Sequence, residues 1–364
     1  MQSKVKIMFL YSSTGFGGLV NNLAKIINCL DRTQFSVFLV SLEDNNPCVE
    51  LLDSDLETQV IKLACCGRLD FSLPFKIRDL VKKHGIQVIN ADGYKADFYA
   101  ILTRLLVRVK LVTILHGWVA CSLKVRLYQH LDQFLFLFFD RVILLSPVQL
   151  QRHRFLNLIK YKTNVIPNGI DLLEFKGDYQ SAIQDQSTPF VIGTCARLAK
   201  EKDLVTLIKA CAKLSSFKWK LVIVGDGEQR DFLQRIVNSE QIQDQVEFVG
   251  YKSEIRPYLN SFSVFVSTSL KEGMPNSVLE AAAFNLPVVL SDIPEHQYLV
   301  RGQVDGLFFK VGDSEDLANK LTWINQNPSL STAFGLSFKA RVSAEFSLEQ
   351  RKHKLEKLYL EVAC

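Results

Sequence analysis

Two glutamates in the C-terminal half flank a segment that cannot form a regular helix. Glu272 and Glu280 stand at the ends of EGMPNSVLE, with Gly273 and Pro275 between them. We therefore expect Glu272 in a loop and Glu280 in a helix capped by the asparagine or the serine after the proline. A carboxylate can accept two hydrogen bonds from a vicinal diol, so one glutamate suits a ribose and the other a sugar ring, with loop N–H groups facing a phosphate. A purely structural role for Glu280 in the first helical turn leaves the Gly-Met-Pro-Asn loop unexplained.

Two cations earlier in the chain have the chemistry to bind a diphosphate. Arg197 follows the apolar run FVIGTC, and Lys202 stands just before a helix expected to start near Asp203. Cations beside a helix N-terminus favour a bound phosphate. The alternative is that both side chains simply face water.

Glycines near the N-terminus predict a second anion site. Gly15, Gly17 and Gly18 stand between an expected strand and an expected helix, where free N–H groups can face a phosphate. Val20 occupies the place of the third glycine in a dinucleotide-binding fingerprint, which disfavours NAD. A tight turn that needs glycine and has no ligand is the other interpretation.

One histidine has a position that favours function. His116 ends the apolar run VTIL and precedes a glycine, at the C-terminal end of an expected strand. The other five histidines have no such context.

The elements that position these residues follow an alternating strand and helix pattern. Apolar runs such as KIMFLY and FSVFLVSL alternate with amphipathic segments, and the pattern restarts after a polar stretch at 177–189. This predicts an α/β protein with two parallel-sheet domains, 1–168 and 169–345. Ligands of open parallel sheets bind beyond the C-terminal strand ends, so we expect a substrate cleft between the domains.

Composition limits the class of protein. The 364 residues are 48% hydrophobic and 22% charged, which indicates a globular chain of about two domains. The longest dense apolar run, 134–139, is far shorter than the roughly 20 residues of a spanning helix, and no signal peptide is recognisable. The eight cysteines include no C-x-x-C pair, so we expect reduced thiols and a cytoplasmic protein.

Positive charge is concentrated in the N-terminal half. Residues 1–168 carry 21 lysines and arginines against 13 acidic residues, and 104–162 carry ten against two. Such a surface suits an anionic membrane or a phosphorylated acceptor, and we expect salt-sensitive contact with anionic membrane through 104–162, aided by LYQHLDQFLFLFF. A solvated basic surface over a buried helix is the alternative.

A possible metal motif lies far from these stretches. Asp53 and Asp55 have D-x-D spacing, but they follow the second expected strand in a short polar segment. We expect no metal site.

Taken together, six motifs in order resemble the retaining nucleotide-sugar glycosyltransferases of GT-B fold, family four. They are GFGG, HGW, VIPNGID, ARLAKEK, VIVGDGE and EGMPNSVLEA. The resemblance covers nearly the whole chain. It implies two Rossmann-like domains facing each other across a cleft, an acceptor-side domain and a donor-binding domain, with a C-terminal helix at 346–364 that returns to the first domain.

The resemblance also implies roles for individual residues. Catalytic roles fall to His116, Arg197, Lys202 and Glu272. Donor binding falls to Gly17, Gly18, Arg197, Lys202, Gly273, Met274, Pro275, Asn276 and Glu280. The cations would hold the diphosphate, Glu280 the ribose, and Glu272 with the amides of 273–276 the transferred sugar.

Two departures from the family pattern stand out. Asn285 replaces the usual glycine, and because asparagine tolerates positive φ, the helix can still end there. The stretches CCGRLDFSLPF and ADGYKADF match no acceptor that we can assign.

The resemblance implies a metal-independent reaction on one sugar face, in which the leaving diphosphate helps to deprotonate the acceptor. We therefore expect transfer from a nucleotide sugar, a UDP-sugar by resemblance, to a glycan or lipid-linked acceptor of a surface polysaccharide or glycolipid. No cofactor and no nucleic-acid partner are expected. The alternatives are a nucleotide-sugar epimerase of the same fold and a non-catalytic partner subunit.

Overall fold

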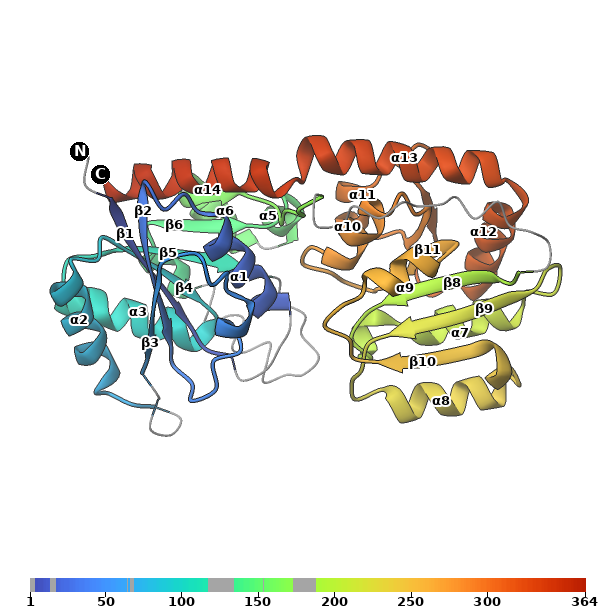
Figure 1. The fold of residues 1–364 in the computed structure, drawn as a ribbon, viewed down its shortest axis with the longest axis horizontal. Coiled ribbons are helices and arrows are strands. Elements are labelled where there is room, and N and C mark those ends of the chain that lie inside the picture. Colours follow the sequence, from blue (N-terminus) through green and yellow to red (C-terminus); the bar gives the residue numbers. More distant parts are fainter. Residues whose placement is uncertain are drawn as a thin grey trace. The chain divides into compact units, whose positions relative to one another are not determined.

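The computed structural model describes residues 4–13, 18–63, 65, 69–116, 134–152, 154–172 and 188–364. The chain divides into two compact units. We call Met1–Asn168 with Leu348–Cys364 the N-unit, and Gly169–Ser347 the C-unit. Figure 1 shows the elements of each.

The N-unit is built on a parallel sheet. Its strands have the order β3-β2-β1-β4-β5-β6-β7. They are β1 (Val5–Tyr11), β2 (Phe35–Ser41), β3 (Thr58–Lys62), β4 (Val88–Asp92), β5 (Lys110–Leu115), β6 (Arg141–Leu144) and β7 (Thr163–Val165). The helices are α1 (Gly18–Cys29), α2 (Leu73–His84), α3 (Tyr94–Leu106), α5 (Val148–Arg152), α6 (Arg154–Leu158) and α14 (Leu348–Ala363), with short 3-10 turns η1 (Val49–Leu51), η2 (Phe136–Phe138) and η3 (Lys160–Lys162).

Strand β1 is covered on both faces from residue 7 onward, and residues 7–11 are accordingly apolar without interruption. Met8 and Leu10 pack into the core that α2 and α3 contribute to. Phe9, which points to the other face, contacts Tyr359 of α14 edge-on. The C-terminal helix therefore returns to the first unit, as the sequence predicts, and Figure 1 shows α14 along this sheet.

The C-unit repeats the same strand order. Its sheet has the order β10-β9-β8-β11-β12-β13. In both sheets all strands are parallel, and the strand order reverses next to the first strand, as in Rossmann-like sheets. The strands are β8 (Phe190–Cys195), β9 (Trp219–Val224), β10 (Val246–Gly250), β11 (Val264–Ser267), β12 (Val288–Ser291) and β13 (Leu307–Phe309). The helices are α7 (Leu204–Ala212), α8 (Arg230–Ser239), α9 (Arg256–Ser261), α10 (Asn276–Ala283), α11 (Pro294–Leu299), α12 (Ser314–Gln326) and α13 (Pro328–Glu345), with turns η4 (Lys200–Lys202) and η5 (Gln243–Gln245). The predicted α/β fold with two parallel sheets is confirmed.

Helix α10 is packed tightly against α13. Asn285, at φ 54°, ends the helix in the left-handed conformation that the sequence anticipated. Its carbonyl oxygen would lie 1.8 Å from a Cβ added at Gly335, so only glycine allows α13 to pass this close.

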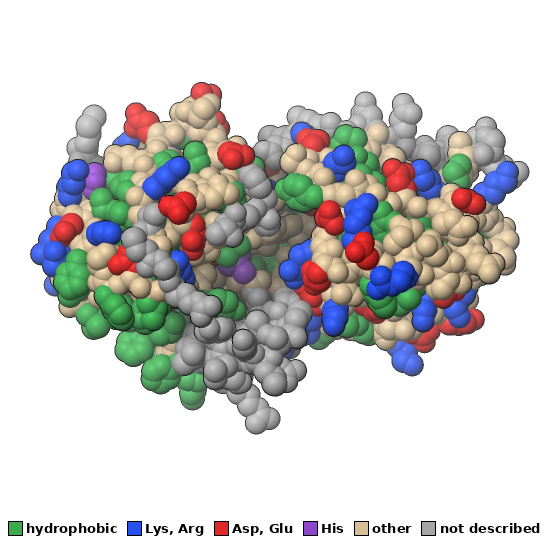
Figure 2. Space-filling view, turned by 90° about the horizontal axis from the view of Figure 1, so that it is seen from below, with side chains coloured by type: hydrophobic (Ala, Val, Ile, Leu, Met, Phe, Trp, Pro, Cys, Tyr) green, Lys and Arg blue, Asp and Glu red, His purple; other side chains and the backbone are tan. Residues whose placement is uncertain are grey.

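Two surface properties concern function. Across the described helices, none is long and apolar enough to cross a membrane. Figure 2 shows hydrophobic side chains gathered over the N-unit on one face, whereas charges of both signs are interspersed over the C-unit.

Candidate active site

The loops that carry the predicted donor residues leave neighbouring strands of the C-unit sheet. β8 leads into Arg197 and Lys202, and β11 leads into Glu272. Because β8 and β11 pair in parallel, both loops emerge at the C-terminal ends of the strands, at the same end of the sheet. This is the point where the strand order reverses, at which open α/β sheets bind ligands.

Lys202 and Glu272, 70 residues apart in sequence, meet directly. The Lys202 ammonium lies 2.5 Å from Oε1 of Glu272, and the Ser269 hydroxyl donates to the same oxygen over 2.6 Å. The Thr268 hydroxyl donates to the carbonyl oxygen of Lys202 over 2.8 Å, which ties the two loops together. Glu272 is only 9% exposed, so this ion pair is well shielded from solvent.

Arg197 also has a carboxylate partner. Its guanidinium pairs with Glu201, one turn further along. The Arg197 side chain is 61% exposed whereas that of Glu201 is 8% exposed, so the guanidinium is accessible at the loop surface. From the sequence we expect both cations to face a diphosphate; in the structure each also has a carboxylate partner in its own unit.

A glycine after β9 brings a third loop against the Arg197 loop. A Cβ at Gly225 would lie 1.9 Å from the carbonyl oxygen of Ala196, so the backbones touch there. Leu198 N donates to the carbonyl oxygen of Asp226 over 2.9 Å beside this contact. The motif VIVGDGE thus supports the loop that carries Arg197.

The loop before α10 differs from the sequence expectation in its cap. Pro275 occupies the N-cap position, and no side chain caps the helix, because Asn276 is already the first helical residue. The predicted cap by Asn276 or Ser277 is therefore wrong. Gly273, Met274 and Pro275 are buried, and Asn276 is half-buried.

Glu280 lies in α10, half-buried. Burial raises the pKa of the Cys195 thiol, and the negative charge of Glu280 raises it further. Cys195 is the last residue of β8, directly before the loop that carries Arg197. In the structure, the described donor candidates of the C-unit thus follow the C-terminal ends of two neighbouring strands, β8 and β11, of one sheet.

A histidine without a predicted role in the sequence, His296, connects to Glu272 through two serines. His296 is fully buried, and its Nδ1 donates to the carbonyl oxygen of Ser291 over 2.8 Å. Its Nε2 lies 3.3 Å from the Ser267 hydroxyl, which lies 3.3 Å from the Ser269 hydroxyl that holds Glu272. Burial lowers the pKa of His296, against the opposing charge of Glu272. The signal for His296 in the sequence is its position shortly after a strand, β12. His116 was predicted to be functional because it directly follows a strand.

Polar side chains also gather at the C-terminal ends of the strands in the N-unit sheet. His116 follows β5, and its Nε2 lies 2.6 Å from Oδ1 of Asp92. Asp92 is fully buried at the end of β4, the neighbouring strand. His116 was expected from the sequence, whereas Asp92, which orients the imidazole, was not.

Other polar side chains line the same edge. Glu43 accepts from the Ser12 hydroxyl at 2.6 Å and pairs with the Lys95 ammonium at 3.0 Å. Burial opposes ionisation of Glu43, but these hydrogen bonds and the charge of Lys95 together lower its pKa. Gly18 begins α1, and a Cβ there would have no neighbour within 4 Å, whereas Gly15 and Gly17 lie outside the described residues.

No described group of three His, Cys, Asp or Glu side chains could hold a metal. The Asp53 carboxylate instead accepts from the backbone N–H of Asp55 over 3.1 Å, which is typical of a polar turn.

Family models match both units. Residues 16–173 match Glycosyltransferase Family 4, and residues 176–339 match Glycosyl transferases group 1. With two Rossmann-like sheets and a family-model match over each unit, the chain is a glycosyltransferase of the GT-B class. It belongs to the group 1 glycosyltransferases of family 4.

Individual relatives agree with this class. A UDP-Gal:alpha-D-GlcNAc-diphosphoundecaprenol alpha-1,3-galactosyltransferase of Escherichia coli is 24% identical over 380 residues, covering 99% of this chain and 98% of the relative. The amylovoran biosynthesis glycosyltransferase AmsK of Erwinia amylovora is 30% identical over 253 residues, or 65% and 60% of the two chains. The solved structure of Anabaena Alr3699/HepE in complex with UDP has a TM-score of 0.84 at 21% identity, covering 98% of this chain and all of that one (100%).

Proposed function

We propose that the protein is a retaining, metal-independent transferase that moves a sugar from a UDP-sugar to a glycan or lipid-linked acceptor during synthesis of a surface polysaccharide. The galactosyltransferase relative and the amylovoran enzyme support this substrate class. The observation that carries the donor site is the shielded Lys202–Glu272 pair where the loops after β8 and β11 converge.

In this proposal the cations stabilise the leaving diphosphate. Lys202 lies between the Glu272 carboxylate and the diphosphate, and Arg197 covers the phosphates from the exposed side. Glu280 accepts from the ribose hydroxyls, and the second oxygen of Glu272 accepts from the transferred sugar.

The bond changes need no enzyme nucleophile. The anomeric carbon–oxygen bond to the diphosphate breaks as the acceptor oxygen attacks the same face, and the acceptor proton passes to the departing diphosphate. His116, oriented by Asp92, is proposed to contact the sugar.

A thermal-shift series with UDP, GDP and ADP, each with and without EDTA, tests the donor site. A ligand at a hundredfold its Kd stabilises by about 2.7 kcal/mol, which makes a selective shift easy to measure. We expect a shift with UDP that EDTA leaves unchanged and that Lys202→Ala reduces. Lys213→Ala is the control, because Lys213 pairs with Glu315 at the surface. A UDP shift abolished by EDTA would contradict the metal-free site.

Product analysis separates transfer from epimerisation. A transferase consumes the UDP-sugar in proportion to added acceptor. Conversion of the donor sugar to its epimer without acceptor would replace the proposal by the epimerase alternative.

A further inference from the structure

A basic pocket that the proposed reaction does not use lies at the N-terminal ends of strands in the N-unit sheet, which we call its amino edge. The pocket has a volume of about 520 Å³ and is lined by Arg104 to Lys110 and by Asp140. β5 begins at Lys110 and β6 begins at Arg141, so the pocket lies where these strands start. His116 stands at the other end of β5, about 20 Å away at the usual rise per residue.

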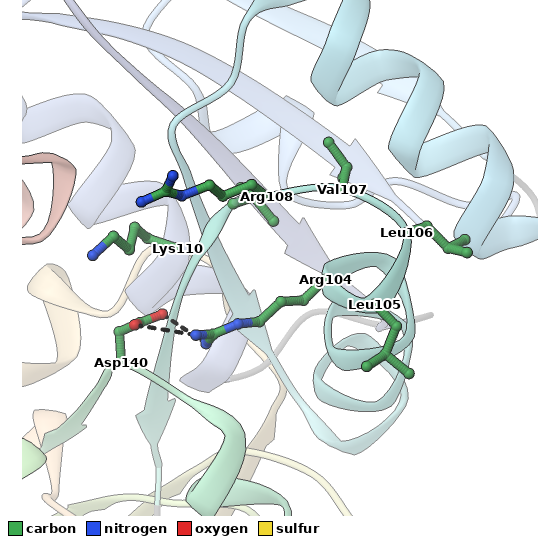
Figure 3. A pocket seen from close by; sticks show the side chains of 8 residues that line it. Arg104, Leu105, Leu106, Val107, Arg108, Lys110 and Asp140 are labelled. Atoms are coloured by element: carbon green, nitrogen blue, oxygen red, sulfur yellow. Dashed lines mark hydrogen bonds and ion pairs between the residues drawn. The ribbon is translucent and has the colours of Figure 1, made fainter.

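The charge at the pocket is positive. Arg104 is held by Asp140 at 2.8 Å and also donates to the carbonyl oxygen of Phe138 over 2.9 Å. Asp140 is the one acid among the described residues that line the pocket. Arg108 and Lys110 extend toward the same side in Figure 3, and within the described part of the chain neither forms an ion pair. Two cations are therefore available to one anion.

Apolar side chains surround these cations. Leu105 is 77% exposed, and Figure 3 shows it pointing away from the charged groups. Phe134 and Phe138, 55% and 47% exposed, pack edge-on against each other next to the carbonyl that Arg104 contacts. Well-exposed aromatic and leucine side chains beside unpaired cations are typical of surfaces that bind partners. We call Arg104, Leu105, Arg108, Lys110, Phe134 and Phe138 the amino-edge patch.

We propose that the amino-edge patch binds an anionic lipid bilayer, with a headgroup phosphate in the pocket between Arg108 and Lys110. The leucine and the phenylalanines enter the boundary between headgroups and acyl chains. Charge complementarity selects this occupant, because anionic lipids attract basic clusters at the surface and the exposed rings add apolar area.

The patch extends along the same edge of the sheet. Lys162 of η3 donates to the carbonyl oxygen of Leu137 over 3.0 Å, so η3 adjoins η2. Tyr161, 76% exposed, lies beneath the Lys162 ammonium and repeats the combination of ring and cation. The membrane contact that the sequence predicts within 104–162 is here proposed for the amino-edge patch and the adjoining η3. The part of LYQHLDQFLFLFF before Phe134 lies outside the described residues.

Sedimentation of the full chain with vesicles tests the proposal. We expect binding to an equimolar mixture of phosphatidylcholine and phosphatidylglycerol, little binding to pure phosphatidylcholine, and weakening by salt. Arg108→Ala with Lys110→Ala should lower the partition coefficient by roughly 30-fold, because each removes one charge at the surface. The matched control is Lys82→Ala with Lys83→Ala, which removes two charges from α2 of the same unit.

Leu105→Ser tests the apolar part independently, with the exposed Leu330→Ser in the C-unit as its control. We expect the Leu105 change alone to lower vesicle binding. Circular dichroism and the UDP thermal shift should be unchanged in every variant.

Three outcomes overturn the proposal. Equal binding to neutral vesicles removes the role of charge. An equal loss in the α2 control pair means that only total charge counts. Saturable binding of inorganic phosphate that Arg108→Ala abolishes, without any vesicle binding, assigns the pocket to a soluble anion instead.

Discussion

At the scale of single residues, the site depends on charges that already have partners. Lys202 forms an ion pair with Glu272, and Arg197 forms an ion pair with Glu201. In the proposed donor site, a diphosphate would therefore enter an arrangement with no uncompensated buried cation, which avoids the cost of an isolated charge.

Lys202→Ala should lower kcat/KM by about 10- to 100-fold, because a charge-assisted hydrogen bond contributes roughly 1.5 to 3 kcal/mol. The measurement is steady-state transfer from the UDP-sugar, with Lys213→Ala as the comparison. An unchanged kcat/KM in a folded variant would remove Lys202 from the diphosphate site.

His296 should make stability depend on pH. Burial lowers its pKa in the folded state, so the unfolded chain binds the proton more readily. The contribution of His296 to the free energy of unfolding should therefore be constant above about pH 6.5 and should fall below it, by at most about 1.4 kcal/mol per pH unit. Urea unfolding at pH 7.5 and pH 5.5 measures this difference.

Removing the titrating group should flatten that dependence. His296→Gln should show a smaller loss between the two pH values than the wild type, whereas His353→Gln, at an exposed position, should keep the wild-type loss. An identical loss in all three proteins would assign the pH dependence to other groups.

At the scale of elements, α10 is positioned by α13. Gly335→Ala should destabilise the protein by about 1 to 3 kcal/mol or more, because the new methyl group would overlap the carbonyl oxygen of Asn285. Thermal unfolding measures the loss. Ser343→Ala, on the exposed side of α13, should stay within about 0.5 kcal/mol of the wild type. Equal stability of both variants would show that α13 can move away without cost.

The sequence predicted elements better than it predicted contacts. The apolar run at 7–11 in β1 and the positive φ of Asn285 are local properties, and both were anticipated. The partnership of His116 with Asp92 depends on which strands become neighbours, and no local pattern encodes that order. The missing cap on α10 has a different, local cause, because the helix begins at Asn276 and the N-cap position falls on Pro275.

At the scale of the whole molecule, α14 completes the N-unit. Arg351 donates to Asn22 over 2.5 Å, and the Tyr359 hydroxyl donates to Asn90 over 2.9 Å, both in buried positions. Burial lowers the pKa of Arg351 to about 10.

Tyr359→Phe should therefore cost about 1 to 3 kcal/mol, because it leaves the oxygen of Asn90 buried without this donor. Chemical denaturation measures the loss, and Tyr161→Phe, at a 76% exposed position, should be neutral. A neutral Tyr359→Phe would show that packing of the ring, rather than its hydroxyl, secures α14.

The same helix sets an order of events during synthesis. The C-unit is one continuous segment, Gly169–Ser347, and can fold as soon as it has left the ribosome. The N-unit, although its first strand is made earliest, lacks the cover over Phe9 and the partners of Asn22 and Asn90 until residues 348–364 emerge. Of the two units, the one whose strands are translated first is thus the one whose buried contacts are completed last.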